Sequence, residues 1–126
     1  MSGYRRPTRK PIVTFDPFDV VVVPFPFTDR STAKRRPALV LSDAGVFNKQ
    51  SGHSVLAMIT SARNSDWPLD VEIRELDAAG LPSASTVRMK LFTLDDRLVI
   101  RKAGQLGKND RKKVILALRR LFALNP

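Results

Sequence analysis

The chain has 126 residues, 43% of them hydrophobic, which fits one domain with a hydrophobic core rather than a disordered segment. It has no cysteine and one histidine, which excludes disulfides and zinc sites of the usual Cys/His pattern. The formal net charge of +10 is typical of domains that bind a polyanion, although a solvated basic surface that aids solubility explains it equally well.

The first 16 residues are basic and precede the predicted domain. Residues 1–16 lack the continuous apolar run and small-residue cleavage site of a signal peptide, so we expect a flexible basic arm there. A single domain over residues 17–126 follows. The longest apolar run, residues 20–27, is too short to span a bilayer and contains prolines. We therefore expect no membrane partner, and a cytoplasmic location is compatible with the cysteine-free composition.

Short strands fill the middle of the chain. Apolar, β-branched or alternating runs predict them at residues 19–23, 54–59, 70–73, 86–91 and 98–100, with a further strand that begins at Pro37. Prolines and a polar cluster predict a loop over 25–34.

Local signals mark the turns between these strands. Ser42 or Asp43 is expected to cap a short helical turn that ends at Phe47. Gly80 is expected to supply a positive φ in the turn at 77–82.

From Asn109 onward the apolar residues follow a helical period. The apolar stripe consists of Val114, Ile115, Leu118, Leu121 and Phe122. Asn109 or Asp110 is expected to cap this helix. The expected fold class is α+β, with short antiparallel strands curled into a small barrel and one C-terminal amphipathic helix laid on the sheet.

Common catalytic motifs are absent from the sequence. It contains no Gly-rich phosphate loop, no Gly-x-Ser-x-Gly and no His-Glu-x-x-His. His53 stands alone, which favours a surface or loop histidine.

What remains is a set of cations and hydroxyls at strand ends. Arg36 precedes the second strand, Thr60 and Ser61 follow the third, and Arg88 lies within a later one. Judged by spacing alone, Arg36, Thr60 and Arg88 each have an ordinary structural explanation. Arg36 fits a surface ion pair, Thr60 a turn cap, and Arg88 a stem packed along the sheet.

Three stretches resemble a known family when they are taken together. They are DVVVVPFPFTD…KRRPALVLS (19–42), VLAMITS (55–61) and STVRMKLFTLDDRLVIRKAGQL (85–106). In this order and spacing they resemble the PemK/MazF toxins of bacterial toxin–antitoxin pairs, over about residues 17–124. The resemblance implies an SH3-like barrel, a homodimer, and sequence-specific endoribonuclease activity on single-stranded RNA without metal or other cofactor. It also implies a cognate antitoxin whose acidic, flexible tail covers the RNA site, with DNA contacted only indirectly through that antitoxin.

The resemblance assigns residues to the implied site. The catalytic set is Arg36 of the RP motif, Thr60 of the ITS motif and Arg88 of the VVR-like motif. The accompanying RNA-binding positions are Phe27, Thr28, Asp29, Arg35, Ser61 and Lys90.

The sequence also departs from the family pattern. Some members have an aspartate where this chain has Lys90, and some have a histidine in the first loop, where this chain has only hydroxyls and Asp29. These departures leave the general base open, with Asp29 as a candidate. Phe25 and Phe27 are both candidates for stacking on bases, although either could equally plug the barrel end. We prefer Phe27 for RNA because Thr28 follows it.

The chemistry of RNA cleavage suits these residue types. When the RNA 2′-hydroxyl is the attacking group, the protein must align it and stabilise charge on the phosphorus oxygens. The planar fork of arginine donates two parallel hydrogen bonds to such oxygens, but it cannot accept a proton. Two other classes remain open: a CcdB-like barrel toxin that inhibits a topoisomerase, and a nucleic-acid-binding module without catalysis.

Overall fold

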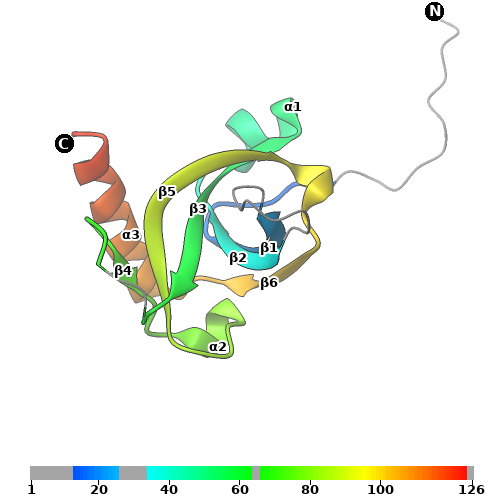
Figure 1. The fold of residues 1–126 in the computed structure, drawn as a ribbon. Coiled ribbons are helices and arrows are strands. Elements are labelled where there is room, and N and C mark those ends of the chain that lie inside the picture. Colours follow the sequence, from blue (N-terminus) through cyan, green and yellow to red (C-terminus); the bar gives the residue numbers. More distant parts are fainter. Residues whose placement is uncertain (1–12, 26–33, 64–65, 125–126) are drawn as a thin grey trace, which may run out of the picture.

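The structure is a computed structural model and describes residues 13–25, 34–63 and 66–124. Within these residues, six strands form one sheet in the order β4–β5–β3–β2–β1–β6, and all neighbouring strands are antiparallel. The strands are β1 Asp19–Phe25, β2 Lys34–Val40, β3 His53–Ser61, β4 Val71–Glu72, β5 Ser85–Asp95 and β6 Arg101–Gln105. Figure 1 shows β3 and β5 curving around β1 and β2, so that the sheet forms a curled half-barrel. The expected α+β fold class is confirmed.

Short helical turns join the strands, and one longer helix ends the fold. A turn of π-helix, Ala44–Asn48, runs into α1 Lys49–Ser51 between β2 and β3. The helical turn α2 Leu76–Ala79 precedes β5, and a 3-10 turn Asp96–Leu98 follows it. The C-terminal helix α3 spans Lys108–Leu121. Among the described residues, no helix has the length and apolar character needed to cross a bilayer.

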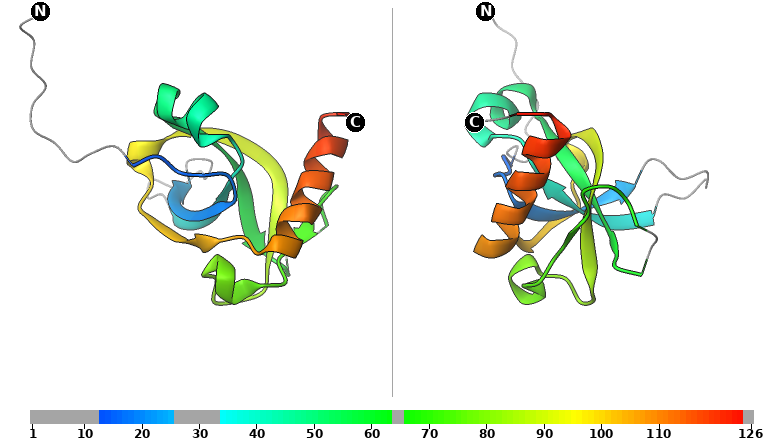
Figure 2. Two further views of the ribbon diagram at one scale, coloured as in Figure 1. Left: turned by 180° about the vertical axis from the view of Figure 1, so that it is seen from behind. Right: turned by 90° about the vertical axis from the view of Figure 1, so that its left-hand side faces the viewer.

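Alternation along the strands divides the buried side chains into two clusters. The helix-side core contains Val20 and Leu39 from the sheet and Val114 from α3. The barrel core contains their strand neighbours Val21 and Val40. Successive side chains of a strand point to opposite faces, so each strand contributes to both cores. The helix α3 covers the outer face of the sheet near β4 and β5, as both views of Figure 2 show.

The barrel core reaches further toward the N-terminus than the expected domain boundary. Phe15 is buried in this core, and Asp16 donates its backbone N–H to Asp19 at 2.9 Å. The packed residues therefore include Phe15, which lies within the predicted arm. Residues 1–12 of the expected arm lie outside the described residues.

The strand bounds differ from the sequence-based predictions by a few residues, and the differences are informative at β2 and at the predicted strand 98–100. β2 begins at Lys34 and not at Pro37. Its first residues pair with β1 alone, so the missing N–H of Pro37 does not interrupt the strand. The predicted strand at 98–100 is wrong. Asp95 accepts the backbone N–H of Arg97 and starts a 3-10 turn, and the strand follows at 101–105.

The start and the buried face of α3 also differ. Neither Asn109 nor Asp110 is the N-cap, since α3 begins after Gly107. Asp110 is instead buried in the first turn, where it accepts the backbone N–H groups of Arg74 and Glu75 at 3.0 to 3.2 Å. The buried helix face is formed by Asp110, Val114 and Ala117, with Leu118 beside it. The other predicted stripe residues, Ile115, Leu121 and Phe122, are exposed.

Candidate active site

Arg36 and Thr60 lie on the same face of the sheet. Ala38 belongs to the barrel core and pairs directly with Met58 of β3. Arg36 is two residues from Ala38 along β2, and Thr60 is two residues from Met58 along β3. Directly opposed residues and residues two apart share a face, so both side chains stand on the barrel-core face. The β2–β3 pairing ends at Ala38, which leaves Arg36 and Thr60 at the end of the ladder where the two strands separate.

Arg88 joins this face from the neighbouring strand. It pairs with Met58, while Thr60 pairs with Thr86 two residues away on β5. Cross-strand partners in an antiparallel sheet have Cα atoms about 4.5 to 5.5 Å apart. The three residues implied by the resemblance therefore occupy adjacent positions on three consecutive strands, β2, β3 and β5.

The guanidinium of Arg36 is half-buried and incompletely bonded. Its Cζ lies 5.8 Å from the ring centroid of Phe25. Its Nε is buried and has no hydrogen-bond partner among the described residues. A buried donor without an acceptor costs about 1 to 3 kcal/mol, so this N–H is a position where an external acceptor oxygen gains a strong hydrogen bond.

The guanidinium of Arg88 is in a different electrostatic state. It donates from Nε and Nη2 to the two carboxylate oxygens of Asp70, at 3.2 and 2.9 Å. These hydrogen bonds raise the pKa of Arg88, and burial opposes them only in part. Asp70 was not predicted as a site residue from the sequence. The turn signal of Pro68 close before it was the available hint, but no pattern in the sequence connects residue 70 to residue 88.

Lys90 and Trp67 lie next to this ion pair. The β3–β5 pairing steps from Arg88 directly to Leu91, and the resulting bulge turns Lys90 outward. The Nζ of Lys90 sits 4.4 Å from the centroid of the Trp67 ring, and the Cζ of Arg88 sits 5.8 Å from it. Lys90 was predicted from the sequence as an RNA-binding residue, whereas no role was predicted for Trp67.

A pocket of about 290 Å³ adjoins neighbours of the two arginines, namely Phe25 near Arg36 and Met58, the cross-strand partner of Arg88. It is lined by Phe25, Met58, Lys90, Leu91 and Phe92. Phe25 packs edge-to-face on Phe92, with ring centroids 6.1 Å apart, and adjoins the barrel core. This packing favours the interpretation of Phe25 as a plug of the barrel end.

Several predicted RNA-binding residues are placed elsewhere or not described. Arg35 is exposed and alternates with Arg36, so it points to the opposite face of β2. Ser61 is exposed, and its hydroxyl accepts the backbone N–H of Arg63 at 3.3 Å. Phe27, Thr28 and Asp29 lie outside the described residues.

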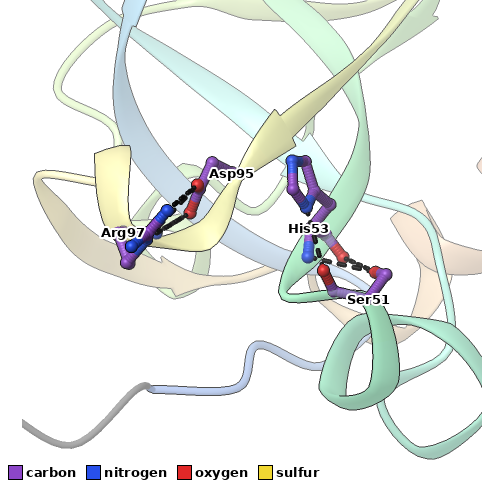
Figure 3. Close-up of polar contacts among 4 residues, drawn as sticks. All are labelled: Ser51, His53, Asp95 and Arg97. Carbon is purple, nitrogen blue, oxygen red and sulfur yellow. Dashed lines mark hydrogen bonds and ion pairs between the residues drawn. The ribbon is translucent and has the colours of Figure 1, made fainter. Parts of the chain in front are cut away.

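His53 takes part in a local turn at the other end of β3 (Figure 3). Its Nδ1 lies 3.0 Å from the backbone carbonyl oxygen of Ser51, which can only accept, so this contact needs the proton on Nδ1. The nearby Asp95 is bound to Arg97, with a shortest contact of 2.7 Å (Figure 3). That guanidinium lowers the pKa of Asp95 to about 2. Ser51, His53 and Asp95 therefore do not form a catalytic triad, because the Ser51 hydroxyl donates to backbone carbonyls and not to the His53 ring.

Within residues 13–25, 34–63 and 66–124, no group of three or more His, Cys, Asp or Glu side chains is arranged to hold a metal ion. The chemistry available on this face consists of fixed cations, a buried hydroxyl and aromatic rings.

A curled antiparallel half-barrel with a C-terminal helix is the fold of the PemK and MazF toxins. Residues 16–122 match the family described as PemK-like, MazF-like toxin of type II toxin–antitoxin system. The chain belongs to this family. No curated protein sequence matches it at a significant level.

Solved structures show the same fold at low sequence identity. A MazE–MazF complex from Deinococcus radiodurans is 24% identical, with 90% of this chain and 100% of that chain covered and a TM-score of 0.71. The Mycobacterium tuberculosis toxin MazF-mt6 is 19% identical, with 86% and 99% covered and a TM-score of 0.68. An endoribonuclease in complex with its cognate antitoxin, from a mycobacterial species, is 16% identical, with 88% and 97% covered and a TM-score of 0.69.

Proposed function

We propose that this toxin is a sequence-specific endoribonuclease that cuts single-stranded RNA without a metal ion. The observation that carries the proposal is the buried Nε–H of Arg36, which has no partner among the described residues and shares a sheet face with Thr60 and Arg88. A phosphodiester oxygen supplies the missing acceptor. The endoribonuclease among the structural relatives supports this reading.

In the proposed reaction the RNA supplies its own nucleophile. The 2′-oxygen attacks the adjacent phosphorus, the bond from phosphorus to the 5′-oxygen breaks, and the products carry a 2′,3′-cyclic phosphate and a 5′-hydroxyl. One proton leaves the 2′-hydroxyl and one is delivered to the 5′-oxygen. Arg36 stabilises the charge on the phosphorus oxygens, a role worth about 3 to 4 kcal/mol in comparable sites. The buried hydroxyl of Thr60 orients the same group.

Arg88 and Asp70 act in this proposal as a fixed pair. Both oxygens of Asp70 accept hydrogen bonds from Arg88, so a proton taken up by Asp70 would disrupt the pair. Asp70 is therefore a positioning residue for Arg88 and not the general base. Asp29 keeps its place as the candidate base proposed from the sequence.

The proposal extends to the partners of the protein. Antitoxin complexes among the structural relatives support an antitoxin partner, and we propose that this antitoxin is acidic and covers the RNA site. A net charge of +10 favours such a partner. A homodimer in the cytoplasm, with DNA reached only through the antitoxin, completes the proposal.

The test is cleavage of a mixed-sequence RNA by the purified protein in excess EDTA, with the new ends mapped chemically. We expect cuts at one short sequence with cyclic phosphate ends, loss of cutting in Arg36→Ala and Thr60→Val, and normal cutting in the charge-matched control Arg101→Ala. Arg101 is exposed on β6 at the other edge of β1. Absence of cutting by the wild type rejects the enzyme. Cutting that survives both site substitutions rejects the site assignment.

A further inference from the structure

Trp67 is the single tryptophan of the chain, and it is a large aromatic side chain left 40% exposed. It belongs to neither the helix-side core nor the barrel core. Its indole lies instead beside the Lys90 ammonium, 4.4 Å from the ring centroid, and within 5.8 Å of the Arg88 guanidinium. An exposed indole flanked by two cations is not explained by packing of the fold.

A strained turn carries this residue. Trp67 and Asp70 exchange hydrogen bonds: the backbone N–H of Trp67 donates to the Asp70 carboxylate, and the backbone N–H of Asp70 donates to the Trp67 carbonyl, both at 3.2 Å. Between them, Pro68 precedes Leu69, whose φ of 66° is the left-handed value that glycine normally supplies at this turn position. Such a conformation costs about 1 to 3 kcal/mol for a residue like leucine.

The turn is anchored to the candidate site. Asp70, which closes the turn, is held by the two hydrogen bonds from Arg88. The backbone of Trp67 is therefore tied to Arg88 through the Asp70 side chain. Leu69 itself packs against the helix-side core, which offsets part of this strain, whereas exposed cation–π contacts such as those of Trp67 stabilise by only about 0.5 to 1 kcal/mol.

We propose that Trp67 is the stacking platform for one nucleobase of the bound RNA, with Lys90 binding a phosphate next to that nucleotide. This inference rests on the proposed function and names one of its binding residues. Single-stranded RNA presents a flat base and an anionic phosphate in each nucleotide, which matches an indole with an ammonium on its ring. Because every base has a π-face, this contact contributes affinity for RNA without sequence specificity.

The fluorescence of Trp67 provides a direct test, because this residue is the only indole in the protein. The probe is a short mixed-sequence RNA with 2′-fluoro groups, which lacks the attacking hydroxyl, and its binding is measured independently by fluorescence anisotropy of an end label. We expect the RNA to quench Trp67 emission in parallel with binding. Inorganic polyphosphate, which has the charge without the bases, is expected to bind without comparable quenching.

Two variants accompany the wild type. Trp67→Leu retains the backbone hydrogen bonds of the turn and should weaken RNA binding by about 5- to 100-fold. Lys90→Met should lower affinity, reduce the salt dependence by about one phosphate contact, and still show quenching. Phe47→Leu is the matched control, because Phe47 is 38% exposed on the helical turn before α1, near the other end of β3, and its loss should leave binding unchanged.

The outcomes separate the two proposals. If the RNA binds, is cut in its 2′-hydroxyl form, and leaves Trp67 emission unchanged while Trp67→Leu binds normally, the stacking platform is rejected and the endoribonuclease stands. Equal quenching by polyphosphate also rejects stacking, because the ring then reports charge alone. If neither RNA binding nor cutting is observed, the proposed function fails together with the platform.

Discussion

The carboxylate of Asp70 binds both the Nε and the Nη2 of Arg88, at 3.2 and 2.9 Å, and their side chains are only 22% and 9% exposed. Arg88 is thus charge-compensated within the protein. Arg36, on the same sheet face, has a buried N–H without an acceptor among the described residues. The two arginines assigned to one task from the sequence are therefore prepared differently: Arg88 is held in place, whereas Arg36 is available to a ligand.

Removal of the Asp70 charge should destabilise the fold. Asp70→Asn leaves the largely buried Arg88 without its carboxylate, and loss of one partner of such a pair costs about 3 kcal/mol. We expect the free energy of unfolding, measured by urea denaturation, to fall by this amount. Asp77→Asn is the charge-matched control, because Asp77 is exposed on α2 and forms no ion pair among the described residues. Equal stability of Asp70→Asn and the wild type would contradict a structural role for this pair.

Arg36 should show the opposite balance between stability and function. Arg36→Met keeps an apolar stem near Phe25 and removes the unsatisfied Nε–H. We expect the free energy of unfolding to stay equal or rise by up to about 1 kcal/mol, while RNA cutting falls by about 100-fold or more. Urea denaturation and cleavage rates measure the two effects. A variant that loses stability and activity together would show that Arg36 is a structural residue.

The strand-and-helix pattern of this chain was largely predictable because each element has its own apolar pattern, although the core joins residues that are distant in the sequence. The β-branched run at 19–23 and the apolar run at 54–59 lie within β1 and β3, where continuous apolar sequence reflects two buried faces. The prediction of a strand at 98–100 was wrong because three consecutive apolar residues do not distinguish a strand from a turn. The hydrogen bond from the Arg97 backbone N–H to the Asp95 carboxylate favours the turn.

The candidate site was only partly predictable from the sequence. Family resemblance pointed to Arg36, Thr60 and Arg88, and strand register brings them to one face. Asp70 and Trp67 were missed because their roles depend on a turn that folds back over β5, a tertiary contact without a sequence period.

Two glycines with the same backbone conformation should respond differently to alanine. Gly52 and Gly80 both have φ of 71°, so a Cβ at either position strains the backbone by about 1 kcal/mol. At Gly52 nothing lies within 4 Å of the added Cβ, whereas at Gly80 it would meet the carbonyl oxygen of Ala103 at 2.1 Å. We expect Gly52→Ala to lose about 1 kcal/mol and Gly80→Ala about 3 kcal/mol or more by urea denaturation. Equal losses would show that α2 is not packed this tightly on β6.

Adjacent carboxylates on the turn after β5 should give opposite pH effects. Burial raises the pKa of Asp96 above its ordinary value of 3.8, and the neighbouring Asp95 charge adds to this effect. The Arg97 guanidinium instead lowers the pKa of Asp95 to about 2. A raised pKa gives stability that is complete below the unfolded-state pKa and is lost as the pH rises through the folded-state value. A lowered pKa gives stability present above the unfolded-state value and lost as the pH falls to about 2.

The test compares Asp96→Asn and Asp95→Asn by thermal unfolding from pH 2 to pH 7. At pH 7 we expect Asp96→Asn to raise the Tm, because the amide keeps an acceptor for the Ser54 hydroxyl without a buried charge. Asp95→Asn should lower the Tm at pH 7, because it loses the ion pair with Arg97. The first difference should vanish below about pH 3.8 and the second should fade as the pH approaches 2. Each variant is the other's control, since both remove one negative charge from the same turn, and Tm shifts of the same sign at pH 7 would contradict the opposite environments of the two carboxylates.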